Sequence, residues 1–70
     1  MMPLALAPVG EVNIIKRVSG KPEIKKHLED MGFVTGAVIT VVSAIGGNLI
    51  VSIKDSKVAL DKNLAGKIMI

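Results

Sequence analysis

Hydrophobic residues recur with two different periods along this chain of 70 residues. Residues 49–53 place Leu, Val and Ile at every second position, which puts these side chains on one face of a β-strand. In residues 22–31, Ile24, Leu28 and Met31 follow one another at intervals of four and three, which puts them on one face of an α-helix. The two periods predict a mixture of strands with one helix.

The predicted helix covers about residues 22–31, and its ends carry recognisable signals. Pro22 suits the first helical position, where a missing N–H costs nothing, and the carboxylate of Glu23 is favourable near the positive end of the helix dipole. Gly32 suits the position just after the helix, because glycine adopts positive φ without strain. A helix of this length is marginal alone, so we expect it to pack on the strands.

Turn residues divide the rest of the chain into short segments. The expected strands are residues 4–6, 11–18, 37–44, 49–54, 57–60 and 67–70. Gly46-Gly47-Asn48 is expected to close a hairpin, and Asp61 is expected to cap a helical turn over residues 62–65, which Gly66 ends. Five to six short strands with one inserted helix predict a mostly β, small, partly open barrel that forms a single domain over residues 1–70.

A membrane-spanning helix is the alternative for residues 31–53, which contain no charged side chain. Glycines and hydroxyl side chains interrupt this stretch, and its pieces are rich in β-branched residues, so two strands explain it better. The N-terminal Met1–Pro8 segment lacks the basic start of a signal peptide, and prolines interrupt its apolar part. We therefore expect a cytoplasmic protein without membrane insertion.

Composition narrows the chemistry. The chain has no cysteine and a single histidine, His27, which excludes disulfides, thiolate metal sites and clusters of histidine ligands. The chain has no Gly-x-Ser-x-Gly pattern that would supply a nucleophile for this histidine to activate, and it has no phosphate-binding loop. It is therefore predicted not to be an enzyme. The net charge of +3 is spread along the chain and Phe33 is the only aromatic residue, so a nucleic-acid-binding barrel is a remote alternative.

One group of possible ligands falls on the predicted helix. Glu23, His27 and Asp30 follow at i, i+4 and i+7, and carboxylate and imidazole are ligands that suit Fe2+ or Zn2+. This spacing allows a weak, open metal site. A solvated polar face with a Glu–His pair is the favoured interpretation, because the sequence supplies neither a further ligand nor a second shell.

The segment Leu28-Glu29-Asp30-Met31-Gly32-Phe33-Val34-Thr35-Gly36, followed by a strand rich in Val and Ile, resembles the signature of the FeoA family, ferrous iron transport protein A. Further segments agree with that family in order: residues 8–11, 46–49, 58–60, 64–65 and Ile68. Thr35 and Asn48 stand where proline is common, and Gly66 replaces a larger residue. These departures affect turns rather than chemistry.

The resemblance implies an SH3-like barrel of about five strands. It also implies a cytoplasmic accessory module for ferrous iron uptake, which acts by protein–protein interaction with a FeoB-type membrane transporter. We expect its contact surface to include Lys25, Lys26 and His27, which face away from the apolar stripe of the helix. We expect that no cofactor is required. The alternative to an accessory module is a protein that itself binds a transition metal, as an iron carrier or a sensor. Exposed strand edges can pair between copies, so a weak homo-oligomer is a further alternative.

Overall fold

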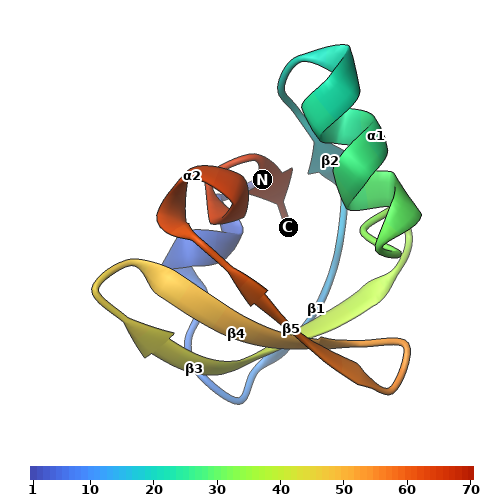
Figure 1. Ribbon diagram of the computed structural model, residues 1–70. Helices are drawn as coiled ribbons and strands as arrows, with labels where there is room; N and C mark the ends of the chain where they lie inside the picture. Colours follow the sequence, from blue (N-terminus) through green and yellow to red (C-terminus); the bar gives the residue numbers. More distant parts are fainter.

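The computed structural model describes all residues, Met1–Ile70, as two antiparallel sheets with an inserted helix (Figure 1). The elements in chain order are η1 (Leu4–Leu6), β1 (Val12–Ile14), β2 (Arg17–Val18), α1 (Pro22–Asp30), β3 (Val38–Ile45), β4 (Asn48–Ile53), β5 (Ser56–Leu60), α2 (Lys62–Ala65) and β6 (Ile68–Met69). One sheet has the strand order β1-β3-β4-β5, and the other pairs β2 with β6. The prediction of a mostly β, partly open barrel with one inserted helix is confirmed.

Two tight hairpins build the larger sheet. Gly46 and Gly47 join β3 to β4 with φ values of 58° and 86°, and Lys54 and Asp55 join β4 to β5 with φ values of 49° and 62°. Positive φ at both central residues defines the two-residue turn whose twist matches that of paired strands. Asn and Asp tolerate this conformation better than Lys does, so the second turn has a local cost at Lys54.

The predicted strand at residues 4–6 is wrong. These residues form the 3-10 helix η1, in which the N–H of Ala7 donates to the carbonyl of Leu4 at 2.9 Å. Strand pairing of the N-terminus occurs earlier, where Met2 and Ile70 exchange two backbone hydrogen bonds of 2.9 and 2.8 Å. The helical turn follows because the chain must leave this pairing while Leu4 is buried completely in the core.

The predicted single strand over residues 11–18 is also wrong, because the chain changes partner in the middle. β1 pairs with β3, whereas β2 pairs with β6. At the junction the N–H of Ile15 donates to Ala37 and the N–H of Lys16 donates to Met69, at 2.9 and 2.8 Å. Consecutive residues thus bond to different sheets, which joins them into one barrel wall.

β3 contains an irregularity that the sequence pattern did not predict. Val41 pairs with Val51 and Ser43 pairs with Ile50, so Val42 is an extra residue in the strand. A bulge of this kind bends the strand and increases its twist. The bend curls the end of β3 and turns Val42 outward, where its side chain is 39% exposed.

The core is entirely aliphatic apart from one phenylalanine, and no polar side chain is buried in it. Its members are Leu4, Ile15, Val18, Leu28, Phe33, Ile39, Val41, Leu49, Val51, Ile53, Leu60, Ala65, Ile68 and Ile70. The predicted inward face of residues 49–53 and the predicted core position of Phe33 are confirmed. The stretch 31–53, considered above as a membrane span, forms a loop and the β3–β4 hairpin, and none of the helices is long and apolar enough to cross a membrane.

Candidate functional site

α1 stands at the periphery of the barrel and is held to it by one face (Figure 1). Pro22 occupies its first turn and Gly32 follows its end with a φ of 100°, as the sequence predicts. Leu28 is fully buried, while Ile24 and Met31 pack against the core and remain partly accessible. The helix is therefore fixed mainly through Leu28, and most of its surface faces solvent.

The predicted partner-binding residues lie on that exposed surface. Lys25, Lys26 and His27 are all exposed, and none of them is needed to hold α1 on the barrel. Their accessibility follows from the spacing of Ile24 and Leu28, since the residues between two positions that face the barrel one helical turn apart must point elsewhere. We name these three consecutive residues the α1 face; they point in different directions around the exposed part of α1, which also carries Glu23, Glu29 and Asp30.

The predicted metal ligands are exposed on the same helix, and the three of them are not gathered around one point. Glu23, His27 and Asp30 each face solvent, and no group of three or more carboxylate or imidazole side chains is placed to hold a metal ion. Glu23 and Asp30 are seven residues apart, about 10.5 Å along the helix axis. His27 can therefore share an ion with one carboxylate or the other, and three-donor coordination requires a rearrangement.

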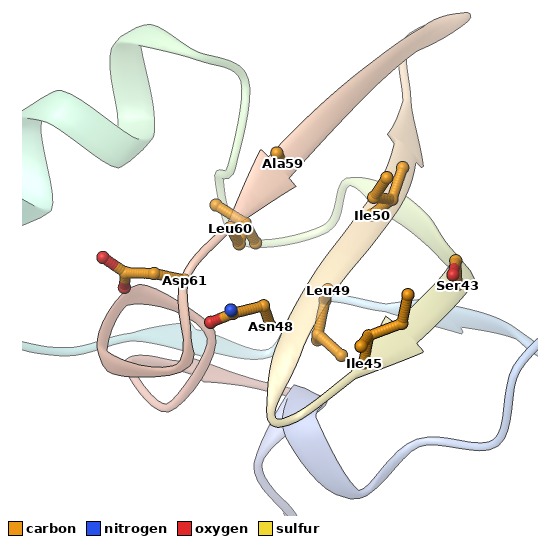
Figure 2. A pocket seen from close by; sticks show the side chains of 8 residues that line it. All are labelled: Ser43, Ile45, Asn48, Leu49, Ile50, Ala59, Leu60 and Asp61. Carbon is orange, nitrogen blue, oxygen red and sulfur yellow. The ribbon is translucent and has the colours of Figure 1, made fainter.

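The sequence analysis missed a surface pocket of about 400 Å³ at the junction of β3, β4, β5 and α2 (Figure 2). Its lining residues are Ser43, Ile45, Asn48, Leu49, Ile50, Ala59, Leu60 and Asp61. Ile45 is 77% exposed and Ile50 is 43% exposed, so the hollow is bordered by apolar side chains that face solvent. Ala59 lies beside Ile50 in the strand register, and its small side chain leaves the space open.

Two hydrogen bonds shape the polar end of this pocket. The side-chain oxygen of Asn48 accepts the N–H of Lys62 at 3.1 Å, and Oδ1 of Asp61 accepts the N–H of Leu64 at 2.8 Å. Both N–H groups belong to the first turn of α2, where no intrahelical acceptor exists. The predicted Asp61 cap is confirmed, and Asn48 is a second cap supplied from the β3–β4 turn.

A further apolar area covers the outer face of β1 and β3. Val12, Ile14 and Val38 are each more than half exposed, and Ile14 pairs directly with Val38 across the sheet. The sequence carried a signal for it in β3, where Val38-Ile39 and Val41-Val42 put apolar side chains on both faces of the strand; in β1, Val12 and Ile14 alternate with Asn13.

Comparison with known proteins gives one consistent result. Residues 2–70 match the FeoA domain family. A protein of Methanocaldococcus jannaschii that is named as an Fe(2+) transport protein A is 36% identical over 70 residues, which is 100% of this chain and 85% of that protein.

Solved structures agree with this match. The crystal structure of an iron uptake regulatory protein, FeoA, superimposes with a TM-score of 0.89 at 29% identity, covering 97% of this chain and 92% of that chain. The FeoA of Stenotrophomonas maltophilia, solved with zinc and described as an SH3 domain protein, has a TM-score of 0.84 at 24% identity, with 99% and 88% covered. The fold is thus SH3-like, and the chain belongs to the FeoA domain family.

Proposed function

We propose that this protein is a cytoplasmic accessory module of ferrous iron uptake that acts by docking on the cytoplasmic part of a FeoB-type transporter. The observation that carries the proposal is the family match over residues 2–70, together with a relative of nearly the same length that is named for Fe(2+) transport. Because the family match covers residues 2–70, we look for the docking surface on the exterior of the barrel.

The α1 face is the surface we propose for this docking. Lys25, Lys26 and His27 are consecutive exposed residues of a helix that stands at the periphery of the barrel, and a partner can cover them without disturbing the core. Lys25 and Lys26 can form ion pairs with acidic side chains of the transporter, and the exposed Glu23, Glu29 and Asp30 of the same helix select against a uniformly acidic surface. Electrostatic complementarity of this kind mainly speeds association and selects the partner, and it weakens as salt rises.

Co-purification tests the docking directly. The cytoplasmic portion of a FeoB-type transporter is immobilised, and the purified protein is passed over it at low and at high salt. We expect retention at low salt that decreases severalfold at high salt, because salt screens ion pairs between the exposed charges of α1 and the transporter. Absence of retention under both conditions contradicts the proposal.

Direct binding of a divalent transition metal by α1 is the second candidate function. It is supported by one local feature: His27 has Glu23 one turn before it and Asp30 one turn after it, all exposed. Titration of Fe2+ or Zn2+ into the protein and into His27→Ala distinguishes the two functions. Equal uptake by both proteins, or no uptake by either, contradicts a metal site on α1.

A further inference from the structure

β5 is an edge strand of the larger sheet. It pairs with β4 along one side, and no other strand pairs with its second side. α2 follows β5 and lies near the end of β4 that carries Asn48 (Figure 2), and the N–H of Lys62 donates to the side-chain oxygen of Asn48. An unpaired strand edge presents free N–H and C=O groups, and these form a template for pairing with another strand.

The hairpin geometry determines which residues of β5 present these groups. In a two-residue hairpin the residues next to the turn, here Ile53 and Ser56, form a hydrogen-bonded pair, and such pairs alternate along an antiparallel ladder. The β4–β5 register has no bulge, so Val58 and Leu60 also bond to β4. The backbone groups of Lys57 and Ala59 therefore point to the free edge.

The side chains of these two residues lie on the outer face of the sheet. Lys57 and Ala59 are exposed, whereas the intervening Val58 faces the core and Leu60 is buried. Asp61 follows at the same two-residue interval with an extended backbone, φ −72° and ψ 168°. Its Oδ1 is bonded to α2, and in Figure 2 its carboxylate points away from Asn48. Along the outer face of the free edge, the side chains are thus basic at Lys57, small at Ala59 and acidic at Asp61.

This order of charges is self-complementary in one register. Two copies of β5 that pair antiparallel about a two-fold axis at Lys57 bring the two lysines face to face, and an axis at Val58 sets Asp55 against Asp61. An axis at Ala59 instead sets Lys57 opposite Asp61 twice, with the two small Ala59 side chains between the charge pairs. Directly opposed like charges destabilise a sheet and opposite charges stabilise it.

We propose that a second copy of this chain pairs with the free edge of β5, with Ala59 of one copy opposite Ala59 of the other and Lys57 opposite Asp61. The two four-stranded sheets then form one continuous sheet of eight strands. None of the residues named in this pairing belongs to the α1 face, so variants at Lys25 and Lys26 test the docking proposed above separately. The contact is short, and it forms a weak, salt-sensitive dimer.

Disulfide trapping tests the register, because the chain has no cysteine of its own. In the proposed dimer the Ala59 positions form a hydrogen-bonded pair with about 5.5 Å between Cα atoms, within the range that a disulfide spans. The Lys57 positions of the two copies are displaced by four residues, about 13 Å along the strand. We expect Ala59→Cys to form covalent dimers on oxidation severalfold faster than Lys57→Cys and than Ala5→Cys, a matched exposed alanine in η1.

Ala59→Cys that oxidises no faster than Ala5→Cys overturns the proposal, as does Lys57→Cys that oxidises as fast as Ala59→Cys. A second arm uses the charges: Lys57→Glu, added to Ala59→Cys, is expected to slow trapping severalfold, as is high salt. A rate unchanged by both conditions also overturns the proposed register. Circular dichroism of each variant shows that the barrel is intact in the comparison.

Discussion

Asn48 and Lys62 join the β3–β4 turn to the start of α2 at the polar end of the pocket, since the Asn48 side chain accepts the Lys62 N–H at 3.1 Å across fourteen residues of sequence. Gly47, just before Asn48, lies against the aliphatic stem of Lys62, where an added Cβ would approach to 3.2 Å. The β3–β4 turn and the start of α2 are therefore one packed unit. This unit holds the chain in place between β5 and β6.

Replacing Asn48 by Ala is expected to lower the free energy of unfolding by about 0.5–1.5 kcal/mol, the usual net contribution of one hydrogen bond. Urea denaturation followed by circular dichroism measures the change. Asn63→Ala is the matched control, because Asn63 is exposed in α2, the helix that Asn48 caps, and takes part in neither capping hydrogen bond. An equal loss in both variants contradicts the role of Asn48.

Asp61→Ala is expected to destabilise the protein by about 0.5–2 kcal/mol, since it removes the side-chain cap of α2. Asp61→Ser keeps an oxygen that can accept the Leu64 N–H, and it should recover most of the loss. Denaturation midpoints of the two variants check this. Equal midpoints for Ala and Ser mean that the cap contributes nothing.

Leu28→Ala is expected to cost about 2–5 kcal/mol, because Leu28 is the only fully buried side chain of α1. Domains of this size have a total stability of roughly 3.5–10 kcal/mol, so the variant is near the limit of folding. Hydrogen exchange should show the loss of protection concentrated in α1. Ile24→Ala, at a partly buried position of the same helix, should cost less; an equal or greater cost contradicts the central role of Leu28.

Two glycines should respond in opposite ways to alanine. Gly36 has a φ of 91°, so Gly36→Ala is expected to destabilise the protein by about 1 kcal/mol or more. Gly66 has a φ of −69°, which alanine adopts freely, so Gly66→Ala is expected to be neutral or to stabilise by about 0.4–1 kcal/mol. Thermal and urea midpoints of both variants give the comparison. A loss at Gly66 as large as that at Gly36 would show that backbone conformation is not the cause.

The features predicted correctly from the sequence depend on neighbouring residues. The limits of α1, the Gly46-Gly47 turn and the Asp61 cap each follow from a few adjacent side chains with a strong conformational preference. The errors concern the choice of partner: residues 11–18 read as one strand, but the backbone changes from one sheet to the other at Ile15. Period alone contains no information on which strand will be the neighbour.

The candidate site was predictable to the same extent. The exposure of Lys25, Lys26 and His27 follows from the helical period. The pocket does not, because it forms where β3, β5 and α2 meet and because a bulge at Val42 curls β3. Its polar end depends on Asn48 and Lys62, which come together only when the barrel folds.

The central claim is that the α1 face binds the transporter, and charge reversal tests it most directly. Binding of Lys25→Glu/Lys26→Glu to the cytoplasmic portion of a FeoB-type transporter is compared with that of Lys16→Glu/Arg17→Glu, an equal change of charge at exposed residues in and beside β2. The account predicts a loss of affinity of about tenfold or more for the first pair and a smaller loss for the second, which reflects net charge alone. Unchanged binding of Lys25→Glu/Lys26→Glu, or an equal loss in both pairs, contradicts it.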